Sequence, residues 1–494
     1  MKKKAFQIME ANIPELAHAL ETHEITSREL VEWYLERIAK YDKDGPKLNS
    51  IIRVNPRALQ IATGLDQERK NKGPRSLLHG IPVIVKDNIE TKDMPTTGGN
   101  ILFKNFNPGK DSFIISKLRQ AGAIILAKAN LHEFARGGTT ISSLAGQTRN
   151  PYDLTRTPGG SSGGTGAAVA ANFGAVGLGT DTLNSIRSPA SANNLVGIRP
   201  TMGLLSRDGI MPAALTQDTA GPITRSVIDA AILLKATAGY DPKDPITAWS
   251  TGNIPESYTG KLSIKALKGH RLGVLENFFG SGPEYEEVNR TIHAAIKDLE
   301  SLGARVESIN IPGVYTDNLV SDLDLQAFEG RINFDNYLQN QGTKAPVKSL
   351  EELVLSGCYE KSIERLLKEQ LNYDPNLHGK EYKERLLKRT KLQRQIIATM
   401  TKYQLTALVF PHQKRLVALI GEPQLDRNGI LGAVTGFPSI VVPAGFSRPA
   451  VSAPLGVPIG IEFLGRPWSE GILIGMAYAF EQATGHRKSP VSTP

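Results

Sequence analysis

Two serines and a lysine are the residues of this sequence whose types and surroundings could carry out covalent chemistry. Ser161 and Ser185 lie in a glycine-rich, weakly charged stretch from Thr157 to Gly203, and Lys86 follows the apolar run GIPVIV, residues 80–85. Burial lowers the pKa of a lysine, and the neutral amine can then take a proton from a serine hydroxyl. The pattern therefore indicates nucleophilic catalysis by serine with a lysine as base.

Two other motifs compete for the same stretch. A phosphate-binding loop would need a lysine after its second glycine, which is absent here. Residues 159–163 match the GxSxG pattern of a nucleophile elbow, but an elbow follows a buried strand, whereas residues 153–158 (DLTRTP) are polar and end in proline. A hydrolase of that kind also needs a downstream acid and histidine. The sequence singles out none of the downstream histidines by the loop in which it lies; these are His270, His293, His378, His412 and His486.

Strands and helices that alternate along the first half of the chain must position these residues. Period and composition predict helices within residues 12–41, 56–72, 113–122 and 227–238, and strands at 48–54, 80–85 and 123–130. The apolar blocks at 167–179 and 193–198 predict a buried helix and two closely packed strands, and residues 203–226 are rich in turn formers. The alternation predicts an α/β sheet with helices on its faces.

The second half of the chain predicts a return to the same sheet. Residues 270–276 and 304–312 are strands that flank a helix, and residues 405–411, 438–445 and 457–465 are three more strands, followed by a helix at 469–485. Between the two groups, residues 317–402 are helical and rich in charge, which predicts a helical insertion or cap. We therefore expect one large domain over residues 1–494.

Composition excludes several classes of function. The formal charge is +9 and the pI is about 9.3, but the basic residues are scattered and no nucleic-acid-binding motif accompanies them, so no nucleic-acid partner is expected. Cys358 is the only cysteine and no two histidines have helical ligand spacing, so neither a metal nor another cofactor is expected. No apolar segment follows Lys2–Lys4 and no window is long enough to span a membrane, which predicts a cytoplasmic protein without a membrane partner.

Three segments resemble the hallmark segments of the amidase signature family, in the family's order and spacing. They are GIPVIVKDN (80–88), TPGGSSGG (157–164) and the long run from Gly179 to Gly209. The similarity extends over nearly the whole chain. It implies the family's fold, which is one large mixed β-sheet covered by helices on both faces, with a signature core at residues 69–225 and the helical insertion at 317–402.

The resemblance also implies a Ser-Ser-Lys triad. Ser185 would be the nucleophile, Ser161 the bridging serine and Lys86 the base. In the family the bridging serine follows a cis peptide bond, here Gly160–Ser161, and Ser162 would support that turn by hydrogen bonds. The chemistry requires no cofactor.

The loop before the nucleophile would form the oxyanion hole. The resemblance assigns this role to the backbone N–H groups of Thr182, Leu183, Asn184 and Ser185, and makes Asp181 and Arg187 structural supports of the loop. The family usually has two glycines where this chain has Leu183 and Asn184. Either the loop needs no positive φ at these positions or its geometry differs, and the two side chains should narrow the acyl pocket.

The activity implied is hydrolysis of the C–N bond of a small-molecule amide, with carbamates and esters as further candidate substrates. Residues of the helical insertion and the loop at 411–415 would line the substrate pocket, with His412 or Gln413 pointing into it. Two alternatives stay open: an amidotransferase A-type subunit that releases ammonia from glutamine with partner proteins, and a non-catalytic ligand-binding relative. The resemblance also allows a homodimer.

Overall fold

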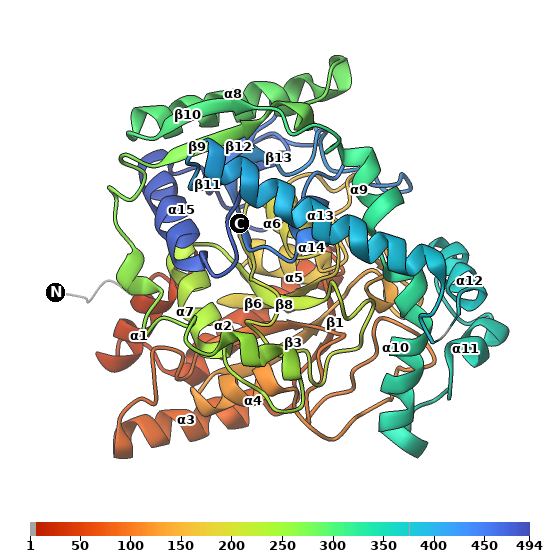
Figure 1. Cartoon of the computed structure of the whole chain (residues 1–494). Coiled ribbons are helices and arrows are strands. Elements are labelled where there is room, and N and C mark those ends of the chain that lie inside the picture. The colour runs from red at the N-terminus through yellow and green to blue at the C-terminus, as the bar shows by residue number, and fades with distance from the viewer. Residues whose placement is uncertain (1–5, 375) are drawn as a thin grey trace.

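One large sheet organises the chain (Figure 1). The computed structural model describes residues 6–374 and 376–494, so the basic N-terminal residues Lys2–Lys4 lie outside it. The sheet has eleven strands in the order β1-β3-β2-β6-β8-β7-β12-β13-β11-β9-β10. In chain order they are β1 (Ile51–Val54), β2 (Pro82–Lys86), β3 (Ile124–Ala129), β6 (Val176–Asp181), β7 (Val196–Arg199), β8 (Thr219–Thr224), β9 (Arg271–Leu275), β10 (Arg305–Ile309), β11 (Ala407–Pro411), β12 (Ser439–Phe446) and β13 (Pro458–Leu464). A two-stranded sheet pairs β4 (Ile141–Ser142) with β5 (Gly146–Gln147).

The large sheet is mixed, as predicted. Strands β3, β2 and β6 are parallel, whereas β8, β7, β12, β13 and β11 follow in antiparallel pairs, and β9 and β10 are parallel to β11. Strands from both halves of the chain alternate with helices, and the late strands join the sheet that the early strands begin. The α/β class predicted from the sequence is confirmed.

Fifteen α-helices surround this sheet within the described residues. They are α1 (Ile13–Glu21), α2 (Ser27–Ile38), α3 (Ala58–Lys72), α4 (Phe113–Gln120), α5 (Gly163–Ala170), α6 (Arg187–Ala192), α7 (Val227–Thr237), α8 (Glu286–Ser301), α9 (Thr316–Leu323), α10 (Gln326–Gln341), α11 (Leu350–Ser356), α12 (Glu364–Asn372), α13 (Lys380–Lys402), α14 (Ile430–Thr435) and α15 (Glu470–Thr484). Thr26 and Glu29 form a capping box, which satisfies two free N–H groups at the start of α2.

The glycines of the central strands let helices approach one face of the sheet closely. Gly177 and Gly179 of β6 face α5, and a Cβ on Gly177 would lie only 2.4 Å from the Thr165 methyl carbon. Val176 and Leu178, which alternate with them, belong to the hydrophobic core on the other face. The glycine-rich composition of this stretch therefore results from the close packing of α5 on β6.

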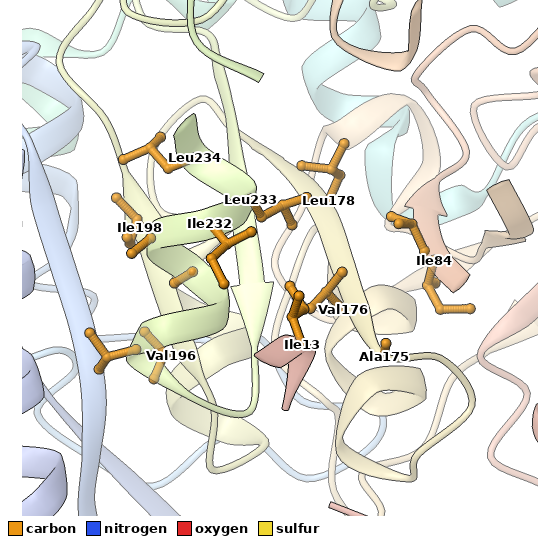
Figure 2. Packing of buried hydrophobic residues seen from close by; sticks show 14 of the residues in the cluster. Ile13, Ile84, Ala175, Val176, Leu178, Val196, Ile198, Ile232, Leu233 and Leu234 are labelled. Carbon is orange, nitrogen blue, oxygen red and sulfur yellow. The ribbon is translucent and has the colours of Figure 1, made fainter. Parts of the chain in front are cut away.

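Strand β7 repeats this division. A Cβ on Gly197 would lie 2.6 Å from Ala190 of α6, whereas Val196 and Ile198 belong to the core on the face covered by α7. Figure 2 shows these two residues with Val176 and Leu178 of β6 beside Ile232, Leu233 and Leu234 of α7. Helices α5 and α6 thus cover one face of the central strands and α7 covers the other.

Strand β8 is the strand of the large sheet that the sequence pattern missed. Its residues lie in the segment predicted to be rich in turns, yet β8 pairs antiparallel with both β6 and β7 near the middle of the sheet. Gly221 and Pro222 hide the strand because both are rare inside strands. The fold places this segment beside the end of β6, where the residues before β8 reach the site.

Helices α9 to α13 separate β10 from β11 in the chain, as expected for residues 317–402. Figure 1 shows α10, α11 and α12 together at the side of the molecule and α13 crossing it in front of α14. Phe334 of α10 packs on Phe134, with ring centroids 5.2 Å apart. The side chain of Tyr337 donates a hydrogen bond to the buried Glu90 carboxylate at 2.9 Å. The helical segment is thereby joined to loops of the core.

Candidate active site

Lys86 is the last residue of β2 and is completely buried. Its Nζ lies 2.7 Å from Ser161 Oγ, 2.8 Å from Thr180 Oγ1 and 3.3 Å from the Thr180 carbonyl oxygen. No carboxylate lies within 4 Å of the amine in the described part of the chain. Burial lowers the pKa of Lys86 to about 7, although the more distant Asp181 and Asp218 carboxylates oppose the shift. The surroundings thus favour a neutral amine beside a serine hydroxyl.

Asp87 does not neutralise this amine, because it points away from it. Successive strand residues face opposite sides of a sheet, as expected for Lys86 and Asp87. Asp87 instead forms a buried ion pair with Lys128 of β3 at 3.1 Å. Its second carboxylate oxygen also accepts hydrogen bonds from the Thr97 backbone N–H and hydroxyl. These contacts engage the Asp87 carboxylate on the other side of the sheet and leave Lys86 without it as a charge partner.

Ser161 lies at the start of the turn that leads into α5. The Gly160–Ser161 peptide bond is cis, as the family resemblance implied. The Ser161 carbonyl accepts a hydrogen bond from the His132 N–H at 2.9 Å. The Ser162 hydroxyl donates to the Thr180 carbonyl at 3.1 Å and accepts from the Thr180 N–H at 3.3 Å. Ser162 therefore fastens this turn to the end of β6, as predicted for a supporting residue.

The loop from Asp181 to Ser185 has an asymmetric pattern of hydrogen bonds. Every carbonyl in it accepts one: from Arg199, Gln217, Arg187, the Ser188 N–H and the Ser162 N–H, in chain order. Within the described residues, the N–H groups of residues 182–185 have no such partner in the protein. A loop that binds its carbonyls and leaves successive N–H groups free is suited to hold a negatively charged oxygen.

Two arginines and two carboxylates hold this loop from behind. Arg187 forms buried ion pairs with Asp181 at 3.1 Å and with Glu462 of β13 at 2.5 Å, and Arg199 pairs with Asp181 at 2.8 Å. Burial alone would raise the pKa of Asp181, but the two guanidinium groups lower it well below its usual range. Asp181 and Arg187 contact each other beside the loop, and Arg199 and Glu462 complete the network.

Gln217 and Asp218, immediately before β8, also hold the loop and were not assigned a role from the sequence. The Asp218 carboxylate accepts hydrogen bonds from the Thr182 hydroxyl at 2.6 Å and from the Ala213 N–H at 2.8 Å. Gln217 donates from Nε2 to the Thr182 carbonyl at 3.3 Å and to Asp324 at 3.0 Å. In the sequence they are a polar pair directly before β8. The strand itself was not recognised because it contains a glycine and a proline, so the pair could not be placed at a strand end.

Ser185 lines a hollow of about 210 Å³ between this loop and the helical segment. The loop itself contributes Thr182, Leu183 and Asn184 to the wall. Neither Leu183 nor Asn184 has a positive φ, so the loop forms here without the backbone freedom of glycine. Leu183 is 8% exposed and packs in a cluster with residues of β11, α13 and α14. The structure therefore agrees with the first possibility raised from the sequence, that the loop needs no positive φ at Leu183 and Asn184.

No hydrogen bond joins the Ser161 and Ser185 hydroxyls within the described residues. The two serines are connected through the backbone, where the Ser162 N–H donates to the Ser185 carbonyl at 3.3 Å. Hydrogen bonds between catalytic groups are often long in unliganded sites and shorten when substrate binds. Ser185 is 5% exposed and Ser161 is completely buried, so of the two serines Ser185 is the one that substrate can reach.

The structure places His412 and Gln413 outside the lining of this hollow, in contrast to the prediction for the 411–415 loop. The His412 side chain is fully buried behind the nucleophile loop, with Nδ1 2.7 Å from Glu462 Oε2. Gln413 forms a backbone bridge with Arg427, and it is Arg427 that lines the hollow. The sequence correctly pointed to the end of β11, but the side chain that lines the hollow is that of Arg427, in the segment bridged to Gln413.

His132 is a further residue near the site that sequence reasoning missed. Burial lowers its pKa to about 3, with a smaller effect from Lys86 and Arg427. Nδ1 accepts a hydrogen bond from the Thr139 N–H at 3.2 Å, so Nε2 carries the proton and donates to the Ser362 hydroxyl at 3.0 Å. Ser362 lines the hollow and belongs to the helical segment. The neutral histidine therefore connects that segment to the Ser161 turn.

The fold and this site define an α/β protein of the mixed-sheet type with a buried lysine next to a serine at one strand end. The chain belongs to the amidase signature family. The family model described as "Amidase" matches residues 29–474.

Relatives with different described functions match this chain over its length. The crystal structure of native peptide amidase from Stenotrophomonas maltophilia is 36% identical, with a TM-score of 0.88 over 98% of this chain and 99% of that chain. A protein described as a probable amidase from Arabidopsis thaliana is 36% identical over 98% of this chain and 92% of its own length. The A-type subunit of glutamyl-tRNA(Gln) amidotransferase from Thermoanaerobacter pseudethanolicus is 34% identical over 98% of both chains.

The described residues also bear on whether the protein crosses a membrane or holds a metal ion. No helix in residues 6–374 and 376–494 is long and apolar enough to cross a membrane. The same residues contain no group of three or more His, Cys, Asp and Glu side chains arranged to hold a metal ion. Cys358 is a free, half-buried cysteine just after α11.

Proposed function

We propose that this chain is an amidohydrolase that cleaves the C–N bond of a carboxylic amide through an acyl-enzyme on Ser185. The observation that carries the proposal is the 2.7 Å contact between Lys86 Nζ and Ser161 Oγ in a pocket without a neighbouring carboxylate. A lysine in that environment holds a lone pair at neutral pH and can act as a base.

In the proposed reaction the Ser185 oxygen attacks the amide carbonyl carbon. Its proton passes to Ser161 as the Ser161 proton passes to Lys86 Nζ, so Lys86 becomes positively charged and the substrate oxygen negatively charged. The free N–H groups of residues 182–185 bind that oxygen. The loss of one such donor typically costs about 2.7–4 kcal/mol in barrier height.

The same relay then runs in reverse. Lys86 returns a proton through Ser161 to the amide nitrogen, the C–N bond breaks, and ammonia or an amine leaves. Water attacks the acyl-enzyme while its proton passes to Lys86 by the same route. When the ester bond to Ser185 breaks, the proton returns to the Ser185 oxygen, and the free acid is released.

The test is ammonia or amine release by the purified chain alone. The panel comprises aliphatic and aryl amides, a peptide C-terminal amide, ethyl carbamate and glutamine, each measured with the wild type, Ser185→Ala and Lys86→Ala. We expect turnover of at least one simple amide that both substitutions abolish. If the folded wild type released neither ammonia nor an amine from any member of the panel, the proposal would be overturned.

A second candidate function is an amidotransferase A-type subunit. The similarity to the Thermoanaerobacter protein over 98% of both chains favours it. This function predicts that only glutamine is hydrolysed and that a stable complex with partner proteins forms. Hydrolysis of an aliphatic or aryl amide by the isolated chain would favour the independent hydrolase.

A further inference from the structure

The hollow beside Ser185 carries an excess of positive charge. Three arginines line it, Arg136, Arg365 and Arg427, together with one carboxylate, Asp324. Charges that line a concave, partly desolvated site act more strongly on a ligand than charges on an open surface. The wall therefore favours a ligand with a negative group.

Two of these arginines are already engaged by the protein. Arg136 donates from Nε to Gln370 at 3.2 Å, and its guanidinium lies 5.2 Å from the centre of the Phe334 ring. Arg365 is exposed on α12 and pairs with Glu369 at 3.4 Å. Both contribute charge to the hollow, but their donors are directed at other parts of the protein.

Arg427 differs because its guanidinium is unengaged. Within the described part of the chain it makes no hydrogen bond and no ion pair. Burial lowers its pKa, and the negative charge of Asp324 opposes that shift. A cation that is taken partly out of water without a partner has donors available for a ligand.

The position of Arg427 is close to the turn that holds Ser161. A Cβ on Gly138 would lie 3.5 Å from Arg427 Nη1, and a Cβ on Gly160 would lie 2.7 Å from the carbonyl carbon of Gly138. Arg427 therefore reaches the backbone next to the cis peptide bond. It lines the same hollow as Ser185 from that side.

The backbone around Arg427 is held in place by the strand end opposite it. Gln413 and Arg427 form an antiparallel bridge, and the Lys414 N–H donates to the Asp426 carbonyl at 2.9 Å. Arg415 pairs with the Asp426 carboxylate at 2.5 Å. These contacts hold the backbone of Arg427 in place, which limits the conformational entropy that the residue loses when it binds a ligand.

We propose that Arg427 binds a carboxylate of the substrate, so that the preferred amides carry a negative group a few bonds from the scissile carbonyl. This inference rests on the proposed amidase function and deepens it. The planar guanidinium matches a carboxylate with two parallel hydrogen bonds. A hollow of about 210 Å³ is small for a binding pocket, so the substrate class is short amides of this kind, such as monoamides of dicarboxylic acids.

The experiment compares acidic amides with neutral amides of the same length. Glutaramate is paired with pentanamide and succinamate with butanamide, and kcat/KM is measured by ammonia release. Hippurate, an N-acylglycine, tests a carboxylate on the amine side of the scissile bond, and its hydrolysis is followed by the release of glycine instead of ammonia. The wild type should have a higher kcat/KM for one of these two kinds of acidic amide than for the neutral amides. Arg427→Gln should lower that preference by about ten- to a hundredfold, because KM for the acidic amide rises, while turnover of the neutral amides continues.

Two further variants keep the test decisive. Arg427→Lys retains the charge without the planar fork and should keep part of the preference. Arg448→Gln removes an exposed charge that pairs with Glu286 and Glu287 and does not line the hollow, and it should change kcat/KM for neither the acidic nor the neutral amides. Equal ratios of acidic to neutral turnover in the wild type and Arg427→Gln would overturn this inference and leave the amidase function standing. An absence of turnover on every amide would instead overturn the function itself.

Discussion

Lys86 and Lys128 are two fully buried lysines on neighbouring parallel strands whose amines have opposite surroundings. Strands β2 and β3 pair Val85 with Lys128 and Lys86 with Ala129, so the two lysines are offset by one residue and lie on opposite faces of the sheet. Lys128 meets the Asp87 carboxylate at 3.1 Å, whereas Lys86 meets only hydroxyl and carbonyl oxygens. The same residue type is thus a structural cation at one position and a candidate base at the other.

Substitution of the two lysines by methionine should separate these roles. Lys86→Met should abolish amide turnover, because general-base catalysis contributes about 10²- to 10⁴-fold. It should cost no stability at neutral pH, because burial of the lysine amine is itself unfavourable, as its lowered pKa shows, and methionine removes that cost. Lys128→Met leaves the Asp87 carboxylate buried without its charge partner and should cost about 3–5 kcal/mol of stability. Denaturant unfolding and ammonia release measured on both variants check the contrast. Equal losses of stability in the two would contradict it.

The pH dependence should follow the pKa of Lys86, which burial lowers to about 7. Below that pH the amine is protonated and cannot accept the Ser161 proton, so kcat/KM should rise tenfold per pH unit below about 7 and level off above it. A pH–rate profile on a neutral amide measures this. A rate that falls as the pH rises through 7 would exclude Lys86 as the base.

The same pKa predicts a linked change in stability. Between pH 7 and the ordinary lysine pKa of 10.5, the unfolded chain binds more protons at this position than the folded chain. The free energy of unfolding should therefore rise with pH across this window, and Lys86→Met should remove that contribution to the slope. Urea unfolding of the wild type and the variant at several pH values tests the sign. An identical slope in the two proteins would show that Lys86 is not neutral in the folded state.

The side chain of Leu183 should limit the size of the acyl group. Leu183→Ala should raise kcat/KM for bulky amides relative to small ones, because the residue lines the hollow, and should cost about 2–5 kcal/mol of stability. Leu431→Ala is the matched control, since Leu431 packs in the same cluster and does not line the hollow. The control should lose stability without a change in substrate preference. A preference that shifts equally in both variants would assign the effect to loosened packing.

The ion pair between Arg187 and Glu462 should support the loop that carries the free N–H groups. Glu462→Gln keeps the shape of the side chain but removes its charge, and should cost about 3–5 kcal/mol of stability, because Arg187 and His412 lose a buried partner. Glu307→Gln is the control, since the pair of Glu307 with Arg271 is partly exposed and should contribute at most about 1 kcal/mol. Thermal unfolding of both variants measures the difference. A similar cost in both would show that the buried network adds no stability.

The sequence by itself determined what depends on local pattern. The apolar run that ends at Lys86, the glycine-rich block and the strand periods predicted the α/β class and most of the strands, and the mixed sheet was implied by the resemblance to the family. Resemblance to the family predicted which serines accompany the lysine. Local pattern is informative here because strand alternation and the glycines of a closely packed helix leave marks in the residues themselves.

The tertiary structure decided everything that depends on which distant segments meet. Strand β8 was hidden because its glycine and proline read as a turn, and only its pairing with β6 and β7 makes it a strand. His412 follows a strand as predicted, yet its ring pairs with Glu462, and the side chain that lines the hollow comes from Arg427 across a bridge. Which face a side chain takes, and which charge it meets there, is set by sheet register and by contacts far apart in the chain, and no local pattern encodes these.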